Sequence, residues 1–304
     1  MDYLGKSVTG VKIEWSVWTS WLIELPVEEA LETLLNGGFK NLELSAEHLN
    51  EILARKGVPR ELLDSSSIDR SLRIAAVRGR ISPDTLAPVE FLHAHGPFDA
   101  FNLASKSSES LMISLRKLST WIEACSELGV PILVCHPVSL RSHLPDGESL
   151  KLNSEFYRAL LDVADDYGIM LAVENLGEGF GSTASHLLGI IESADSRRLG
   201  VCVDTGHANL KAYTNRVPQL ILELKGCVVA THVSDNDGSS DQHLFPGRGS
   251  INWREVLRAF GEIGYDRPLN LEISGEIEAC EVSWRMNYLH SLLASFEARY
   301  GDHS

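Results

Sequence analysis

Long apolar segments are missing from this sequence of 304 residues. No run approaches the roughly 20 apolar residues that a membrane-spanning helix requires, which argues against a membrane protein of that kind. The N-terminus lacks the basic start and continuous apolar segment of a secretory signal. The five cysteines show no CxxC spacing, so reduced thiols are expected rather than a disulfide framework. These absences predict a soluble, cytoplasmic protein.

Basic residues are also scarce, because 27 Lys and Arg stand against 42 Asp and Glu, giving a net charge of −15. Such a surface repels polyanions and disfavours nucleic acid as a partner. No glycine-rich phosphate loop follows the first strand that we predict, which disfavours a doubly wound open sheet. A small-molecule substrate is the partner that we expect, and an assembly of several copies is compatible with the sequence.

Short apolar runs alternate with amphipathic segments along the whole chain. Eight runs have the length and composition of buried strands: Val11–Val17, Phe39–Leu44, Val89–Ala94, Ile132–Cys135, Met170–Val173, Gly200–Val203, Val228–Thr231 and Leu269–Ile273. Eight strands that alternate with helices are typical of a parallel barrel. The sequence therefore predicts a single (β/α)8 TIM barrel over residues 1–304.

Amphipathic segments with helical spacing lie between the predicted strands. One apolar stripe runs through Leu111, Leu115, Leu118, Ile122 and Cys125, and another through Val256, Leu257, Phe260 and Ile263. The second stripe stops at Gly264, which suits a helix C-terminus. A last helix is expected over Glu276–Arg299, with Trp284, Leu289, Leu292 and Phe296 inward. Residues Gly57–Leu86 have no regular pattern and predict an elongated insertion, within which Arg73–Ala76 is ambiguous.

Polar side chains recur where the predicted strands end, and in such a barrel these ends meet at the face that carries active sites. The residues concerned are His93 and His95, His136, Glu174, Asp204 and His207, His232 with Asp241 and His243, and Glu272. Several carboxylates buried together are costly unless a cation neutralises them. The pattern therefore predicts a metal site at the mouth of the barrel.

The segments that carry these residues are VEN, VCVDTGH, THVSDND…DQHLFPGRGSINW and NLEIS. In this order they resemble the xylose isomerase-like TIM-barrel superfamily, which includes sugar phosphate isomerases and epimerases. The resemblance implies a divalent metal held by Glu174, Asp204, His232 and Glu272. Mixed carboxylate and imidazole ligands favour Zn²⁺ or Mn²⁺ and also suit Mg²⁺ or Co²⁺.

The same superfamily contains apurinic/apyrimidinic endonucleases, which bind three zinc ions through nine residues. Matching their motifs to this chain gives His95, His136, Glu174, Asp204, His207, His232, Asp241, His243 and Glu272. His93 is an alternative to His95 in this match. The resemblance thus implies between one and three ions per chain.

The function that we expect is metal-dependent isomerisation or epimerisation of a small sugar, sugar phosphate or related polyol ketone through an enediolate. Glu174 and Glu272 are the candidates for proton transfer. His207 would hydrogen-bond a substrate oxygen or complete a second metal site. Trp15 would contribute to an apolar wall together with other tryptophans of its segment, and Arg248 would bind a phosphate or carboxylate. A lyase that dehydrates an inosose-like ketone would use the same chemistry.

Two other functions stay open on the sequence alone. The nine matched residues fit a trinuclear zinc phosphodiesterase that resembles abasic-site endonucleases. The first two predicted strands, in KIEWSVWTSWLIEL and NLELSAEHL, instead resemble sugar-isomerase barrels, in which apolar side chains and a strand-end Glu line a small pocket. A basic, aromatic loop for gripping DNA is not evident. The third alternative is a barrel that binds a sugar or metal without catalysis.

Overall fold

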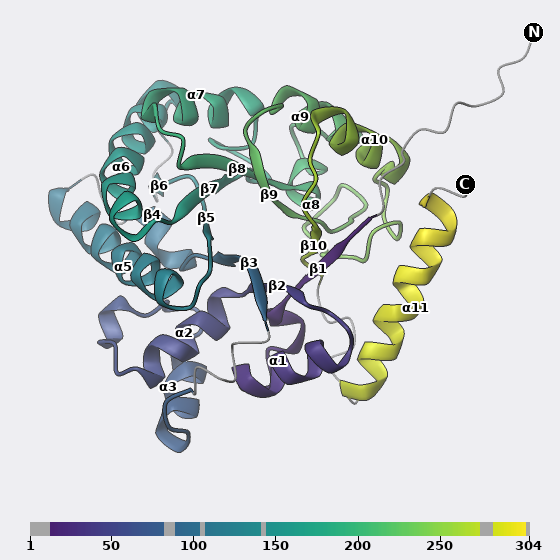
Figure 1. The fold of residues 1–304 in the computed structure, drawn as a ribbon. Coiled ribbons are helices and arrows are strands. Elements are labelled where there is room, and N and C mark those ends of the chain that lie inside the picture. Colours follow the sequence, from purple (N-terminus) through teal and green to yellow (C-terminus); the bar gives the residue numbers. More distant parts are fainter. Residues whose placement is uncertain (1–12, 82–88, 104–106, 141–143, 274–281, 302–304) are drawn as a thin grey trace, which may run out of the picture.

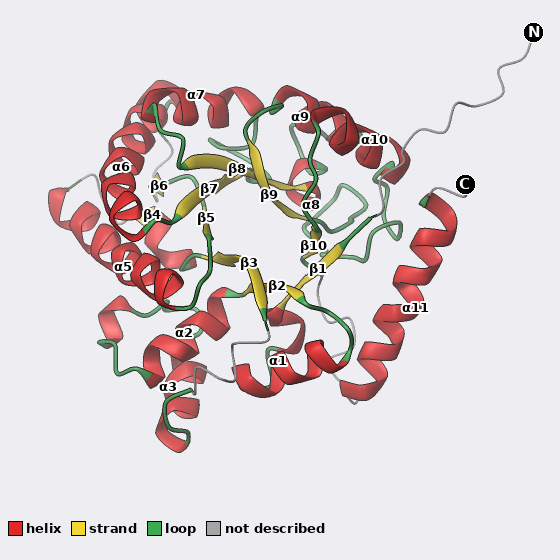
Figure 2. Cartoon of the chain, viewed as in Figure 1, coloured by secondary structure: helices red, strands yellow, loops and turns green. Residues whose placement is uncertain are grey.

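A computed structural model of the chain describes residues 13–81, 89–103, 107–140, 144–273 and 282–301. Eight parallel strands form one sheet in the order β10-β1-β2-β3-β5-β7-β8-β9. Their bounds are β1 Trp15–Trp18, β2 Asn41–Leu44, β3 Glu90–His95, β5 Ile132–Cys135, β7 Met170–Glu174, β8 Leu199–Asp204, β9 Val228–His232 and β10 Leu269–Leu271. The sheet curves into a ring with the helices outside it (Figures 1 and 2).

The ring closes between β9 and β10 through a short contact. Val233 pairs with Leu271 in an isolated parallel bridge. The Val233 amide donates to the Asn270 carbonyl at 2.7 Å, and the Glu272 amide donates to the Val233 carbonyl at 3.2 Å. The predicted TIM barrel is therefore confirmed. All eight predicted strands are present, although the first two residues predicted for β1 lie outside the described part of the chain.

The helices pack around the barrel with their apolar stripes inward. They are α1 Val27–Asn36, α2 Ala46–Arg55, α3 Ile68–Val77, α5 Ser108–Glu127, α6 Asp146–Tyr167, α7 Ala184–Ala194, α8 Thr205–Ala208, α9 Val217–Glu223, α10 Trp253–Ile263 and α11 Val282–Tyr300. Short 3-10 turns cover Thr19–Leu22, Arg60–Leu62 and Phe98–Phe101, and β4 (Asn102–Leu103) pairs with β6 (Ser139–Leu140). Gly264 ends α10 in the left-handed conformation, as its position predicted.

The last helix follows its predicted pattern in part. Leu289 and Phe296 of α11 are buried, whereas Leu292 is half-buried. The first predicted residues of this helix and the side chain of Trp284 lie outside the described part of the chain.

The prediction of an irregular insertion over Gly57–Leu86 is wrong in its centre, where α3 forms and includes Arg73–Ala76. Ile68 and Ser71 are the buried residues of this helix, and polar contacts help to hold it. The buried Asn50 amide of α2 donates to the hydroxyls of Ser67 and Ser71 at 2.9 and 3.3 Å. An apolar pattern alone does not reveal such a buried amide–hydroxyl cluster.

The buried imidazole of His48 in α2 makes stability depend on pH. Its Nε2 lies 3.1 Å from the Leu25 carbonyl. Burial, together with the charge of Arg70, lowers the pKa of His48 from 6.5 to about 3. Below pH 6.5 the unfolded chain therefore takes up a proton that the folded chain does not, and stability falls as the pH decreases towards 3.

We expect His48→Gln to lose less stability than the wild type on acidification. The difference should be about 1.4 kcal/mol for each pH unit between the unfolded and folded pKa values. Urea unfolding of both metal-free proteins at pH 7.5 and at a pH about two units lower measures it. If both proteins lose the same free energy of unfolding between the two pH values, His48 is not the responsible group.

Candidate metal centre

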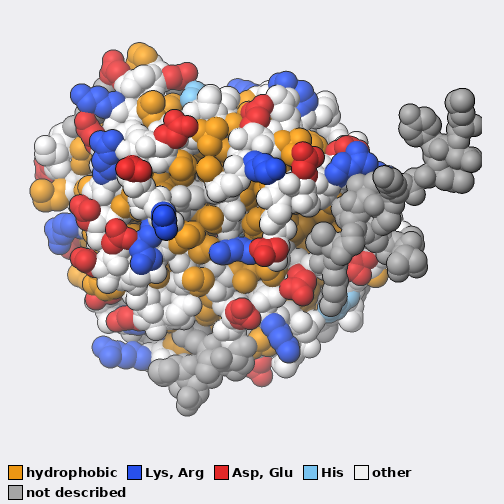
Figure 3. Space-filling model, turned by 45° about the horizontal axis from the view of Figure 1, so that its top comes forward, with side chains coloured by type: hydrophobic (Ala, Val, Ile, Leu, Met, Phe, Trp, Pro, Cys, Tyr) orange, Lys and Arg blue, Asp and Glu red, His pale blue; other side chains and the backbone are white. Residues whose placement is uncertain are grey.

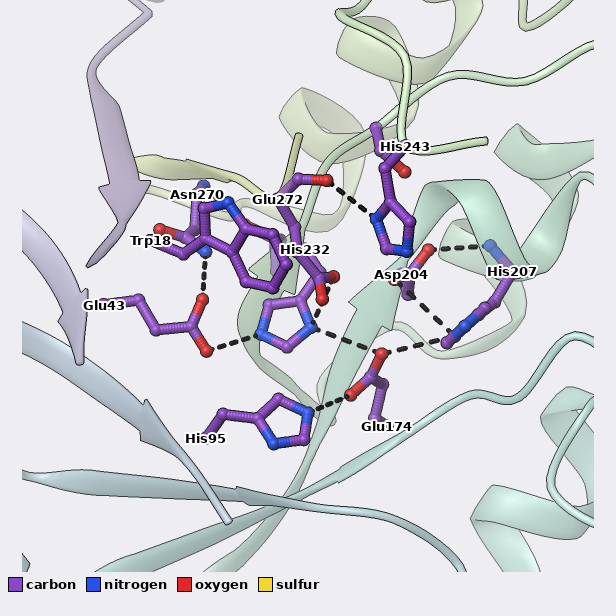
Figure 4. A network of polar contacts seen from close by, with 12 residues as sticks. Trp18, Glu43, His95, Glu174, Asp204, His207, His232, His243, Asn270 and Glu272 are labelled. Carbon is purple, nitrogen blue, oxygen red and sulfur yellow. Dashed lines mark hydrogen bonds and ion pairs between the residues drawn. The ribbon is translucent and has the colours of Figure 1, made fainter. Parts of the chain in front are cut away.

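Four side chains converge at the carboxyl ends of neighbouring strands. Glu174, Asp204 and His232 are the last residues of β7, β8 and β9, and Glu272 follows β10 directly. Because the strands are parallel, these ends share one mouth of the barrel. One ligand atom of each residue lies within 4.8 Å of the others, and Figure 4 shows these side chains pointing towards one another.

Each of the four residues buries a polar atom that has no hydrogen-bond partner: Glu174 Oε2, Asp204 Oδ2, His232 Nδ1 and Glu272 Oε2. The residues are at most 6% exposed. Unsatisfied buried polar atoms are rare because each costs free energy, and several together point to a missing partner. Three carboxylates and one imidazole are the donor set of a divalent metal. The residues present therefore fit the metal that the sequence implies.

The pKa shifts of the buried carboxyl groups also favour a bound metal ion. Burial, reinforced by the charges of Glu272 and Glu174 and opposed by His207, raises the pKa of Asp204 well above its ordinary value. Burial alone would also raise the pKa of Glu174, but His232, His136 and His207 hold it well below its usual range. A carboxylate such as Asp204 is kept ionised at neutral pH when a cation stands beside it.

Two further histidines approach Glu174 from the side of β3 and β5. His95 Nε2 lies 3.4 Å and His136 Nε2 lies 3.2 Å from Glu174 Oε2. The alternative histidine, His93, instead lies with its Nδ1 3.5 Å from Glu43 Oε1. His93 and His95 are two residues apart and therefore lie on the same face of β3, which is the inner one. Of these two, His95 is the histidine that approaches Glu174.

On the other side, Asp204 both ends β8 and caps α8. Its Oδ1 accepts a 2.7 Å hydrogen bond from the His207 amide, so the His207 ring returns to the same mouth. His207 Nδ1 lies 3.3 Å from Glu174 Oε1, and His207 Nε2 lies 3.3 Å from Asp241 Oδ2. His243 Nε2 lies 3.0 Å from the same Asp241 oxygen. The nine residues matched in the sequence thus form one connected network, and their assignment as metal ligands stays a prediction.

The loop that carries Asp241 and His243 is fastened by a buried carboxylate. Asp235 Oδ2 accepts hydrogen bonds of 2.8 Å from the Gly247 amide and from the Trp253 indole. Gly249 passes so close that a Cβ would lie 2.3 Å from Asp235 Oδ1. His243 itself has φ 47°, a left-handed conformation that only a firmly held loop maintains.

The two predicted substrate-binding residues, Trp15 and Arg248, both contact the last helix, α11. Trp15 packs edge-on against Phe296 of α11, with ring centroids 5.3 Å apart. Trp18 is the tryptophan that reaches the cluster: its ring stacks on His243, 5.9 Å away, and its indole donates to the Ile273 carbonyl at 3.0 Å. Arg248 is exposed and lies over the Tyr288 ring. The binding roles of Trp15 and Arg248 stay predictions.

Two further buried residues lie beneath the cluster: Glu43, the strand-end Glu that the resemblance placed in the lining of a pocket, and Asn270, which sequence reasoning did not single out. Glu43 of β2 lies 3.1 Å from His232 Nε2 through its Oε1, and the Asn270 amide donates to its other oxygen. Both residues are fully buried. The signal for Glu43 was a charged residue inside the short apolar strand NLEL, a pattern that NLEIS repeats with Asn270 and Glu272.

The sequence model of the xylose isomerase-like TIM barrel family matches residues 62–292, and the chain belongs to this family. The uncharacterized protein MJ1311 of Methanocaldococcus jannaschii is 31% identical over 187 residues, which are 59% of this chain and 62% of that protein. The uncharacterized protein y4fM of Sinorhizobium fredii is 30% identical over 161 residues, 51% of each chain. The chain thus spans less than two thirds of the length of these relatives.

Solved structures share the fold over almost the whole chain. The IolI protein with a bound zinc atom has a TM-score of 0.73 at 16% identity, covering 95% of this chain and 99% of that one. D-psicose 3-epimerase in the presence of D-fructose has a TM-score of 0.70 at 16% identity, with coverage of 95% and 100%. A D-tagatose 3-epimerase-like protein has a TM-score of 0.66 at 23% identity, with coverage of 94% and 99%. At these identities the likeness establishes the fold.

No helix within the described part of the chain is both long and apolar enough to cross a membrane.

Proposed function

We propose that this chain is a divalent-metal-dependent isomerase or epimerase of a small sugar, sugar phosphate or related polyol ketone. The observation that carries the proposal is the convergence of four buried ligand atoms of Glu174, Asp204, His232 and Glu272 that form no hydrogen bond. These residues would hold the metal. Bound there, a divalent metal would polarise a substrate carbonyl and make the adjacent C–H more acidic.

Glu174 and Glu272 are the residues that we propose to move that proton. His232 Nδ1 lies between them, 3.3 Å from Glu174 Oε1 and 3.1 Å from Glu272 Oε2. Each carboxylate has a second oxygen, which can act as a base while the first one binds. Epimerisation requires the removal of a proton from one face of a substrate and its return to the other face. Two carboxylates that flank the metal site suit these two steps.

The surroundings of the four residues suit a small polyhydroxylated substrate. The side chains of His136, His207 and His243 are 18–25% exposed, whereas those of the four central residues are at most 8% exposed, so the site opens towards these histidines. Their ring nitrogens can hydrogen-bond hydroxyl groups. Trp18, rather than Trp15, would supply the apolar wall, because its ring lies beside His243.

Two groups of side chains beside the four-residue site favour a second function, which is phosphodiester hydrolysis at a site with several metal ions. His95 and His136 share Glu174 Oε2, and His207 and His243 share Asp241 Oδ2. Each group resembles the donor set of an additional zinc ion. On the face in Figure 3, however, basic and acidic side chains are interspersed without a continuous basic band. The net charge of −15 likewise disfavours a nucleic-acid substrate.

Proton exchange with solvent tests the proposed function. The protein, loaded with Mn²⁺ or Zn²⁺, is incubated in D2O with a panel of ketoses, their phosphates and polyol ketones. We expect deuterium at the carbon beside the carbonyl of one substrate, together with a new isomer, and about one tightly bound ion per chain. The chelator-treated protein is the control and should exchange no proton.

Other outcomes would replace this proposal. About three tightly bound ions with incision of abasic-site DNA would establish the phosphodiesterase. Tight sugar binding without any proton exchange would establish a non-catalytic binding barrel.

A further inference from the structure

Beneath the four-residue site lies a carboxylate that the proposed reaction does not use. Glu43 of β2 is fully buried inside the barrel. A carboxylate is expensive in this position unless its oxygens are satisfied. Both are: Oε1 lies 3.1 Å from His232 Nε2, and Oε2 accepts a hydrogen bond from the Asn270 amide. The chain therefore keeps a buried charge where an apolar side chain would pack.

This contact determines which nitrogen of His232 carries the proton. An ionised carboxylate only accepts hydrogen bonds, so Nε2 must be the donor. When a divalent cation occupies the site, the imidazole would be neutral, with its proton on Nε2 and its lone pair on Nδ1. That atom lies among the carboxylates of Glu174 and Glu272 and has no hydrogen-bond partner. Figure 4 shows the two ring nitrogens facing opposite ways, one towards Glu43 and the other towards the mouth.

The partners come from three strands, so the arrangement is fixed by the barrel itself. Asn270 lies two residues before Glu272 along the chain, and the two side chains therefore point inward on the same face. His93 also approaches Glu43 Oε1, at 3.5 Å, but its Nδ1 forms no hydrogen bond. Within the described part of the chain, His232 is the residue whose side-chain contacts link Glu43 to the four-residue site.

We propose that Glu43 is a positioning residue that fixes His232 in the Nε2-protonated form and so presents Nδ1 to a divalent metal. The proposal rests on the metal site of the proposed function. A carboxylate that orients a metal-binding histidine through its second nitrogen raises metal affinity, and its loss typically costs 10- to 100-fold. Asn270 supports the same arrangement by holding the second oxygen of Glu43.

Two substitutions of Glu43 distinguish a role in positioning His232 from a purely structural role. Glu43→Leu removes the acceptor, and we expect His232 to become protonated on Nδ1, where Glu174 or Glu272 accepts the hydrogen bond. Glu43→Gln keeps a carbonyl oxygen that can accept the same bond. We therefore expect Zn²⁺ affinity, measured by competition with a chromophoric chelator, to fall about 10- to 100-fold in Glu43→Leu and less in Glu43→Gln.

Glu51→Leu is the matched control, because Glu51 is an equally buried carboxylate that pairs with Arg55 and Arg70 outside the site. This variant should lose stability without a change in Zn²⁺ affinity. Wild-type affinity in Glu43→Leu, or equal losses in Glu43→Leu and Glu51→Leu, would overturn the proposal.

A second measurement is independent of metal binding and of the folding of any Glu43 variant. Nitrogen-15 NMR of the metal-free wild type, with the His232 signal assigned by its loss in His232→Gln, reports the protonated nitrogen directly. We expect a proton on Nε2, and a ring protonated on Nδ1 alone would overturn the proposal. A wild type that binds no Zn²⁺ but shows the Nε2 proton would contradict the proposed function while leaving the role of Glu43 in place.

Discussion

Replacing Glu174 with glutamine is expected to reduce kcat/KM for the sugar substrate by about 10²- to 10⁴-fold. Glu174 is the centre of the network, since His95, His136, His207 and His232 all approach its two oxygens within 3.4 Å. The amide removes a charged metal ligand and a proton-transfer group in one step. Steady-state kinetics at saturating metal measure the loss.

The control for this variant lies four residues further along the chain. Glu178 is 69% exposed at its side chain and pairs with Lys211 at the surface. Glu178→Gln should keep full activity, because exposed ion pairs contribute little. Activity of Glu174→Gln within about tenfold of the wild type would contradict the role of Glu174 in proton transfer.

Removal of the metal is expected to destabilise the protein by several kcal/mol. An ion that binds only the folded chain stabilises it by about 4 kcal/mol at a free concentration of 1,000 times Kd. For a chain of this length we expect the melting temperature to fall by about 10 °C on chelation and to recover when Zn²⁺ or Mn²⁺ is returned. Differential scanning calorimetry with and without chelator gives the shift.

Asp204→Asn should abolish most of this response, because Asp204 is a fully buried member of the four-residue site. Asp237→Asn is the matched control: Asp237 is exposed and its carboxylate binds only neighbouring loop groups. A melting temperature that neither chelator nor added metal changes would argue against a bound ion.

The sequence predicted the barrel and the position of the mouth well, for a physical reason. Parallel strands buried on both sides are continuous apolar runs, and the polar residue that ends each run marks the mouth. Glu174, Asp204 and His232 could therefore be placed without coordinates. The choice between His93 and His95 could not be made, because both point inward and only the position of Glu174 separates them.

The parts of the structure that the sequence left open depend on the register of strands and on buried polar pairs. Trp15 and Trp18 are three apart and thus face opposite sides of β1, but the sequence does not say which side is inward. Glu43 acquires its role only from His232 and Asn270, which are distant in the chain. Helix α3 depends in the same way on the buried amide of Asn50.

The central prediction is that one divalent ion binds between the ends of β7, β8, β9 and β10. A crystal structure of the protein at its natural metal loading, with anomalous diffraction at the metal edge, tests this most directly. We expect an anomalous peak bound by Glu174 Oε2, Asp204 Oδ2, His232 Nδ1 and Glu272 Oε2. A fully ordered mouth with no anomalous peak among these four atoms, even after soaking in Zn²⁺ and Mn²⁺, would contradict it.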